Sequence, residues 1–148
     1  MANLRLEIPN ATAVYDEQTR VAKIIYSGIL DGDVTIQVYD WLDDLYRDVG
    51  LETIVGQIFD FRKVQAFEES NLSTARRTSN RMNMRVDTSN IPVALLVALL
   101  VNDFYHEEIL RGSMRIPAEH VRKRIVWSED EAWTFIKNWH NDKENETS

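Results

Sequence analysis

The first part of the chain carries the pattern of apolar and polar side chains that is typical of β-strands. Residues 4–8 alternate between the two kinds, as a strand with one buried face does. Val14 and Tyr15 are followed by a polar, turn-like segment and then by the β-branched segment 20–27. This order predicts an antiparallel hairpin formed by residues 14–15 and 20–27.

Three later segments predict further strands. Residues 53–61 and 92–100 are apolar without strict alternation, which is typical of strands that are buried on both faces. Such strands favour parallel neighbours and helices on both sides of the sheet. A loop is expected over residues 62–69, and a final strand is expected over residues 122–127.

A helix is predicted directly after the hairpin and a turn. Asp31 or Asp33 can cap its N-terminus, because a carboxylate there accepts hydrogen bonds from free backbone N–H groups. Gly50 stands where a C-terminal cap is expected. Apolar side chains recur at helical spacing between them and form one stripe: Val34, Val38, Trp41, Leu42, Leu45 and Val49.

Three more helices are predicted after the later strands. Residues 71–85 form a polar helix with a thin apolar face, and residues 103–113 form a helix with Phe104 facing inward. Ser128 and Glu131 have the spacing of a capping box, which opens the last helix. The resulting alternation of strands and helices predicts an α/β fold with a largely parallel sheet.

Composition narrows the class of protein without naming a reaction. The 148 residues correspond to one domain, and 44% apolar with 28% charged residues is ordinary for a globular chain. The absence of cysteine excludes disulfides, thiol catalysis and thiolate metal sites. Since the net charge is −7, the chain lacks the overall positive potential of a nucleic-acid-binding domain.

The sequence contains no predicted targeting or membrane-spanning segment. Its N-terminus lacks a basic region followed by an apolar stretch, so no signal peptide is expected. The longest apolar run, residues 92–101, is about half of the roughly 20 residues that a membrane-spanning helix needs. We therefore expect a cytoplasmic protein without membrane insertion.

Three stretches resemble one protein family. Residues 27–31 (Ser-Gly-Ile-Leu-Asp) are similar to its Gly-X-Leu-Asp-like turn, residues 59–72 to its strand–loop–helix signature, and residues 125–133 to its closing strand and acidic capping turn. The chain thus resembles the STAS family, the sulfate-transporter and anti-sigma-factor-antagonist domains, and especially its stand-alone SpoIIAA-like members. The resemblance implies a mixed, mostly parallel sheet of about four to five strands with about four helices, in one domain over residues 1–140 with a polar tail over residues 141–148.

The resemblance also implies a small, non-enzymatic regulatory module that docks a protein partner or a second copy of itself. In regulatory members, the first Ser of an Asp-Ser-Ser-Gly loop accepts phosphate from a partner kinase. An ungapped alignment places this Ser at Glu69, the Asp at Glu68 and the Gly at Asn71, and only Ser70 matches. The Glu69 carboxylate either imitates a phosphate or simply complements the helix dipole.

The predicted contact surface continues along the following helix. Residues 31–48 carry six Asp and one Arg, whereas residues 76–85 carry four Arg and no acidic residue. Separated charge of this kind is typical either of solvated faces or of surfaces that bind an oppositely charged partner. The docking hypothesis assigns the contact to Glu68, Glu69, Ser70, Asn71, Arg77 and Arg81.

A binding protein for a small apolar ligand or a lipid is the alternative function. Some relatives of this fold resemble carriers of such molecules, and α/β folds bind ligands near strand ends. The candidate pocket residues are Trp41, Phe61, Phe67, Phe104 and Tyr105. Without such a pocket, the tryptophans are expected in the core or at its edge.

No metal or cofactor site is predicted. His106, His120 and His140 lack the four-residue helical spacing of a zinc site, and His106 is expected on the surface of its helix. An acidic helix face, which includes Asp40 and Asp43, points in one direction and does not wrap a cation.

No catalytic residue is predicted either. The chain has five glycines, without a phosphate-cradling loop, and it has no Gly-X-Ser-X-Gly elbow. An enzyme would therefore need a convergent pair such as His106 with Glu68 or Glu69 in a pocket.

Overall fold

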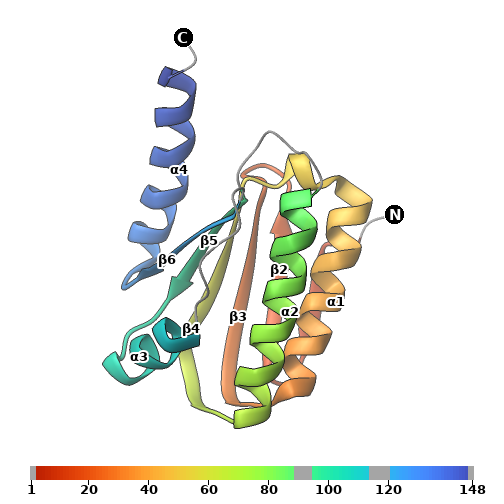
Figure 1. Cartoon of the computed structure of the whole chain (residues 1–148), viewed down its shortest axis with the longest axis vertical. Helices are drawn as coiled ribbons and strands as arrows, with labels where there is room; N and C mark the ends of the chain where they lie inside the picture. Colours follow the sequence, from red (N-terminus) through yellow and green to blue (C-terminus); the bar gives the residue numbers. More distant parts are fainter. Residues whose placement is uncertain (1–2, 89–94, 114–120, 147–148) are drawn as a thin grey trace.

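Six strands form one sheet, in which their order in space follows their order along the chain (Figure 1). The computed structural model describes residues 3–88, 95–113 and 121–146. The strands are β1 Arg5–Ile8, β2 Ala11–Asp16, β3 Val21–Leu30, β4 Gly56–Phe67, β5 Leu95–Leu100 and β6 Val121–Val126. The first three strands pair antiparallel and the last four pair parallel. The α/β class, the hairpin and the mostly parallel sheet are confirmed, but the sheet exceeds the four to five strands expected.

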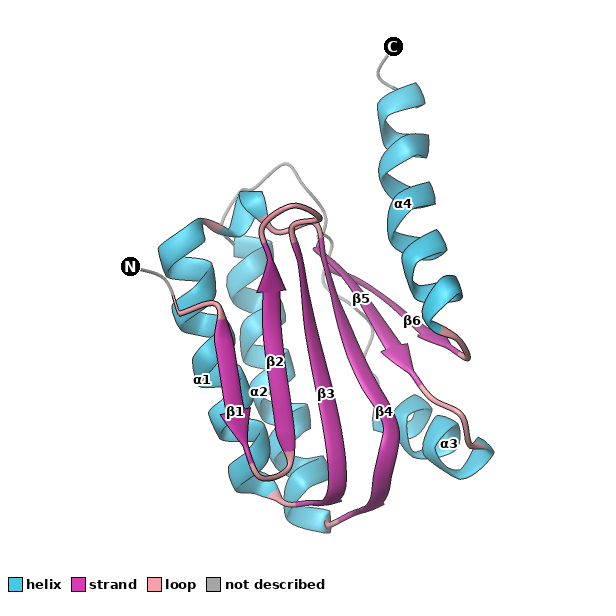
Figure 2. Ribbon diagram, turned by 180° about the vertical axis from the view of Figure 1, so that it is seen from behind, coloured by secondary structure: helices cyan, strands magenta, loops and turns pink. Residues whose placement is uncertain are grey.

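Helices cover both faces of the sheet, as Figure 2 shows from behind. They are α1 Gly32–Val49, the short 3₁₀ turn η1 Leu51–Thr53, α2 Glu69–Thr88, α3 Phe104–Ser113 and α4 Glu129–Glu146. α1 and α2 lie side by side over one face, and the C-terminal part of α4 projects beyond the sheet (Figure 1). α4 therefore continues into the segment that was expected to be a polar tail.

Each face of the sheet has its own apolar cluster, which packs against the helices on that face. Ile24, Phe59 and Val97 belong to the cluster under α1 and α2, which also includes Leu110 of α3. Their neighbours Ile58, Leu96 and Ala98 belong to a second cluster under α4. β4 and β5 are thus buried on both faces, as the unbroken apolar segments predict.

Local signals in the sequence fix the ends of α1. Asp31 Oδ1 accepts a hydrogen bond of 3.1 Å from the Val34 N–H, so the predicted N-cap is confirmed. At the other end, Gly50 has a φ of 88°, and its N–H donates to the Tyr46 carbonyl at 3.0 Å. Glycine adopts this φ without steric cost, which explains why the helix ends there.

The prediction of a loop over residues 62–69 is wrong, because β4 extends through most of this segment. The pairing with β3 shows why the pattern is hidden. Between Asp60 and Lys63, and again between Val64 and Ala66, β4 contains one residue more than the β3 segment that it faces. These are β-bulges, and each one shifts the alternation of the side chains by one position.

The bulges bring four apolar side chains to one face of β4. Phe59 and Phe61 are two residues apart, but Val64 and Phe67 follow at intervals of three, and all four pack in the cluster under α1 and α2. Gly28 of β3 has a φ of 73° and pairs with Val64 of β4 at the point where the register changes. A search for strict alternation misses such a strand.

The sequence assigns the wrong direction to two aromatic side chains of α3. Phe104 is 82% exposed instead of facing inward, and its ring packs at 5.0 Å against that of Trp127, which is 38% exposed. His106, expected at the surface, is only 5% exposed. The helical spacing is correct, but α3 presents a different face to the sheet.

Candidate functional site

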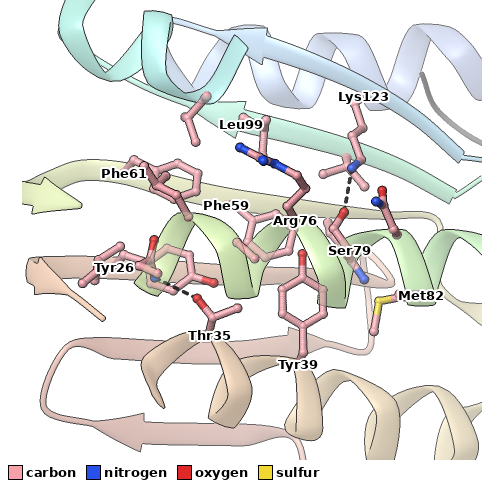
Figure 3. Close-up of a pocket in the computed structure, with 18 of the residues that line it drawn as sticks. Tyr26, Thr35, Tyr39, Phe59, Phe61, Arg76, Ser79, Met82, Leu99 and Lys123 are labelled. Atoms are coloured by element: carbon pink, nitrogen blue, oxygen red, sulfur yellow. Dashed lines mark hydrogen bonds between the residues drawn. The ribbon is translucent and has the colours of Figure 1, made fainter. Parts of the chain in front are cut away.

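A cavity of about 110 Å³ lies between α2 and the sheet face that α1 and α2 cover (Figure 3). Its walls come from α1, α2 and α3 and from strands β3 to β6. The apolar lining consists mainly of Leu30, Phe59, Phe61, Phe67, Leu72, Ala75, Met82, Leu95, Val97, Leu99 and Leu110, with the ring of Tyr26. The lining is thus predominantly apolar.

Stacked aromatic rings form the wall of the cavity on β3 and β4. The Tyr26 ring lies 5.1 Å from that of Phe61 and 6.3 Å from that of Phe59, with interplanar angles of 17° and 10°. Phe67 extends the wall, with its ring 5.8 Å from Phe61. The bulges of β4 therefore help to form this wall, because they keep Phe67 on the same face as Phe61.

A chain of polar groups crosses one side of the cavity. Lys123 Nζ on β6 donates a hydrogen bond of 2.8 Å to Ser79 Oγ on α2, as Figure 3 shows. Tyr39 of α1 belongs to the same lining. Burial raises the pKa of Tyr39 to about 12, although the nearby Ser79 side chain opposes this rise. Tyr39 thus stays a neutral phenol at physiological pH.

The cationic groups of the cavity have no anionic counterpart in its lining. Lys123 and Arg76 contribute positive charge, and none of the described lining residues is Asp or Glu. Among the described residues, Lys123 has only the neutral Ser79 hydroxyl as a hydrogen-bond partner. Desolvation by burial lowers the pKa of Lys123 below its ordinary value, because the charged form loses hydration.

Gln57 adds an unsatisfied polar group. Its side chain lines the cavity from β4 and is only 2% exposed, and its Nε2 finds no hydrogen-bond acceptor among the described residues. An orphaned buried donor costs free energy, and buried polar groups in proteins are nearly always bonded. A polar atom of a bound molecule is one partner that would satisfy it.

Two of the five predicted pocket residues lie in the cavity, namely Phe61 and Phe67. The other three assignments are wrong. Trp41 packs in the core and donates its Nε1–H to the Asn3 carbonyl at 3.0 Å, so it faces β1 rather than the cavity. Phe104 and Tyr105 are 82% and 64% exposed at the start of α3.

The polar residues of the cavity were not predicted as pocket residues, but the alternation of side chains along β6 indicates the direction of Lys123. Along β6, Arg122 and Arg124 lie over the rings of Trp139 and Phe135 on α4. Since side chains alternate along a strand, the residue between them must point to the other face. Lys123 therefore points toward α2, into the cavity.

The residues of the predicted docking surface separate into two groups. Glu68, Glu69 and Ser70 are exposed at the N-terminus of α2, where the Ser70 hydroxyl accepts from the Gly32 N–H at 3.3 Å. Asn71, by contrast, is only 4% exposed, and its Nδ2 donates to the Asp31 carbonyl at 2.9 Å and to Thr35 Oγ1 at 2.8 Å. Its assignment to a partner contact is wrong, because Asn71 joins α2 to α1.

Arg77 and Arg81 line a groove between α1 and α2, together with Asp40 and Asp43. In the same groove, Arg85 forms an ion pair of 2.6 Å with Asp43. The basic stripe of α2 therefore faces the acidic stripe of α1 within the same chain. The charge separation seen in the sequence is partly compensated inside the fold.

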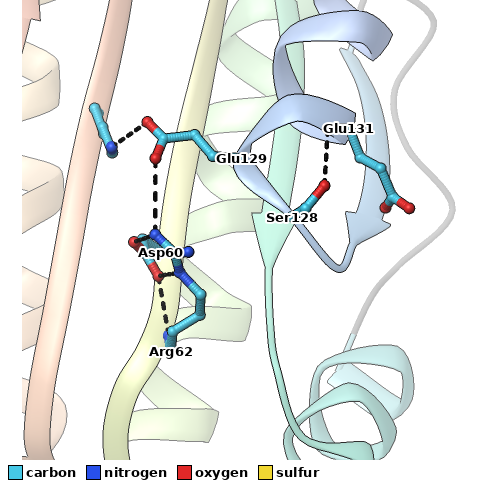
Figure 4. A network of polar contacts seen from close by, with 6 residues as sticks. Asp60, Arg62, Ser128, Glu129 and Glu131 are labelled. Carbon is cyan, nitrogen blue, oxygen red and sulfur yellow. Dashed lines mark hydrogen bonds and ion pairs between the residues drawn. The ribbon is translucent and has the colours of Figure 1, made fainter.

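A second polar cluster lies on the opposite face of the sheet (Figure 4). Asp60 accepts from Arg62 Nε at 3.1 Å and from its NH2 group at 2.9 Å, and Arg62 lies 3.8 Å from Glu129 of α4. Glu129 also pairs with Lys23. Two cations and two carboxylates balance one another, so this cluster acts as a clasp that holds α4 to β3 and β4.

The capping box at the start of α4 is confirmed in part. The Glu131 N–H donates to Ser128 Oγ at 3.1 Å, as the pattern predicts. The Glu131 carboxylate, however, accepts from the Trp127 N–H at 2.8 Å rather than from that of Ser128. The turn thus satisfies two backbone donors at the end of β6.

The histidines do not form a site among the described residues. The His106 ring packs edge-on at 5.3 Å against Phe67, its Nδ1 has no described partner, and neither Glu68 nor Glu69 hydrogen-bonds it. No group of three or more metal-ligating side chains occurs within the described part of the chain. His120 and the side chain of His140 lie outside the described residues.

No protein-family model matches the chain, and no curated protein matches it. Within the segments that the structure describes, no helix combines the length and the apolar character that are required to cross a bilayer.

Proposed function

We propose that this chain is a binding protein that holds a small, largely apolar molecule in the cavity between α2 and the sheet. The observation that supports this proposal is the cavity of about 110 Å³ with stacked rings of Tyr26, Phe59 and Phe61 in its wall. Ligand pockets are typically apolar recesses with a few placed polar groups. An apolar cavity of roughly 150 Å³ admits benzene. Because this cavity is smaller than that, its occupant is at most one ring or a short aliphatic chain.

The proposal is one of binding rather than catalysis. Among the described residues that line the cavity, none is His, Asp or Glu, the side chains that most often transfer protons in enzymes. The hydroxyls of Tyr39 and Ser79 and the ammonium group of Lys123 offer hydrogen bonds that can orient a ligand. A cavity of this composition supports recognition and retention of a molecule.

Membership of the STAS family, the cytoplasmic location and docking of a partner stay predictions. Glu68, Glu69 and Ser70 remain exposed for a contact, so the N-terminus of α2 is the part of the predicted surface that keeps this role. The cavity supports a function more strongly than this exposed helix end does, because seven elements of the fold contribute side chains to its lining.

Toluene is a suitable neutral probe for this proposal, because it is a single apolar ring that carries no charge and no hydrogen-bonding group. Binding to the folded state alone raises the midpoint of thermal unfolding as the ligand concentration rises. We expect toluene to raise the midpoint for the wild type and to shift amide NMR signals of β4. Ala75→Leu fills the cavity from α2 and should abolish both effects.

Ser73→Leu is the matched control, because it adds the same side chain to the exposed side of α2 outside the cavity. This variant should bind toluene like the wild type. Absence of binding to the wild type, or equal binding by Ala75→Leu, would overturn the proposal. Native mass spectrometry of the freshly purified chain then shows whether a natural occupant of this size is retained.

A further inference from the structure

The charge of the cavity is opposite to that of the protein. The chain carries a net charge of −7, yet the described residues around the cavity include Arg76 and Lys123 and no carboxylate. Figure 3 shows Lys123 reaching from β6, and Arg76 from α2, into the space between helix and sheet. A positive recess in an acidic protein attracts anions and repels cations.

Lys123 occupies an environment that disfavours its own charge. It lies half-buried against an apolar cavity, its described hydrogen-bond partner is the neutral Ser79 hydroxyl, and burial lowers its pKa. A desolvated cation is stabilised when an anion comes within hydrogen-bond distance. An ammonium group has three donors, so the bond to Ser79 leaves others for a ligand.

Resting on the proposed function, we infer that the cavity binds a small organic carboxylate, with the carboxylate on Lys123 and the apolar body against the wall of Tyr26, Phe59 and Phe61. Arg76 at the cavity mouth adds a second positive charge. Gln57, which lines the cavity from β4, offers its unsatisfied Nε2 as a further donor. Each of these groups donates hydrogen bonds, and a carboxylate only accepts them.

The size of the cavity separates a carboxylate from larger anions. A volume of about 110 Å³ admits at most one ring, and it does not hold a nucleotide or a long acyl chain. A phosphate dianion is usually bound by several backbone N–H groups in addition to cationic side chains. The polar groups aimed into this cavity are side chains, which favours the monoanion.

Benzoate and benzamide test the inference, because they have nearly the same shape and differ in charge. Titration of the full chain, followed by NMR and calorimetry, should show that benzoate binds at least tenfold more tightly than benzamide. Lys123→Met should remove most of this preference and leave the benzamide affinity within about twofold. Lys123→Arg keeps the charge and should keep the preference for benzoate.

Arg124→Gln is the matched control, because it removes a positive charge from the same strand but on the opposite face, where Arg124 lies over Phe135. Its preference for benzoate should equal that of the wild type. Thermal unfolding of each variant establishes that it is folded before the affinities are compared. If Lys123→Met does not fold, Arg76→Gln carries the test, and it should reduce the benzoate preference because it removes the second positive charge of the cavity.

The outcomes distinguish the inference from the proposed function. Equal binding of benzoate and benzamide would overturn the carboxylate inference and leave the apolar cavity in place. A benzoate preference that survives Lys123→Met, or tighter binding of phenyl phosphate than of benzoate, would also overturn the inference. If toluene fails to bind the wild type, the proposed function itself is wrong, whatever the result with benzoate and benzamide.

Discussion

The side chain of Ile136 on α4 lies directly against the backbone of Gly56 on β4. A Cβ atom added at position 56 would lie 2.9 Å from Ile136 Cδ1 and 3.2 Å from its Cγ1. Ile136 is only 4% exposed and packs with Ile58 and Leu96, so it has little space to move. The close approach of α4 to the sheet thus depends on the missing side chain at position 56.

Gly56→Ala is therefore expected to lower the free energy of unfolding by about 1–3 kcal/mol, the usual cost of overpacking. Ile136→Ala should cost about 2–5 kcal/mol, because it leaves a cavity. The double variant should lose less free energy of unfolding than the sum of the two single losses, since the smaller side chain at position 136 leaves room for the new methyl group. Urea denaturation measures all three. Gly112→Ala is the control, because nothing lies within 4 Å of its Cβ position, and strictly additive losses would contradict the contact.

The clasp that holds α4 makes stability depend on pH. Burial alone would raise the pKa of Asp60, but hydrogen bonds from Arg62 and the charges of Arg62 and Lys23 outweigh it and lower the pKa below the ordinary 3.8. The hydrogen bond from Lys23 is the main cause that lowers the pKa of Glu129 below 4.5. A lowered pKa in the folded state stabilises the fold above the unfolded pKa, and this stabilisation is lost as the pH falls through the folded value.

We expect the wild type to lose stability as the pH falls below about 4.5, and the double variant Asp60→Asn, Glu129→Gln to lose less over the same interval. At pH 7 the double variant should be the less stable of the two. Urea denaturation at a series of pH values measures both curves. Glu7→Gln is the control, because its carboxylate is 76% exposed in a weak pair with Arg5. Parallel curves for wild type and double variant would disprove the role of the clasp.

The elements that the sequence predicts correctly have local causes. α1 begins at Asp31 because its carboxylate caps Val34, and it ends at Gly50 because glycine adopts the φ of 88°. Both signals lie within a few residues of the helix ends. The same holds for the turn at Ser128, whose hydroxyl bonds the N–H of Glu131.

The cavity could be predicted only in part, because contacts distant in sequence create it. The bulges of β4 bring Phe67 beside Phe61 only when β3 is paired alongside. Lys123 meets Ser79 across 44 positions of sequence, and alternation along β6 indicates only its face. Which side of α3 turns inward, and hence the burial of His106, depends on packing against Phe67.

Asn71 is expected to act in folding rather than in contact with a partner. Asn71→Ala removes two hydrogen bonds and leaves the buried Thr35 hydroxyl and the Asp31 carbonyl without this donor, so it should lower the free energy of unfolding by about 1–3 kcal/mol. Glu69→Gln, at an exposed position two residues earlier, should change it by less than about 0.5 kcal/mol. Urea denaturation compares them, and equal effects would contradict the assignment.

The basic stripe of α2 should stabilise the pairing of α1 with α2 through charge. Reversal by Arg77→Glu with Arg81→Glu places carboxylates in the groove that already contains Asp40 and Asp43, so we expect a lower midpoint of urea denaturation. Because salt screens such repulsion, 1 M NaCl should recover part of the loss. The neutral variant Arg77→Gln with Arg81→Gln should lose less than about 1 kcal/mol, since exposed charge pairs contribute little.

Comparison of the reversed and neutral variants separates the two interpretations of this surface. A larger, salt-sensitive loss in the reversed variant means that the arginines act on α1 within the chain. If instead both variants match the wild type at low and high salt, Arg77 and Arg81 exert no force on α1. Their charge would then be free for an acidic partner, and the docking surface predicted from the sequence would extend along α2 from Glu69.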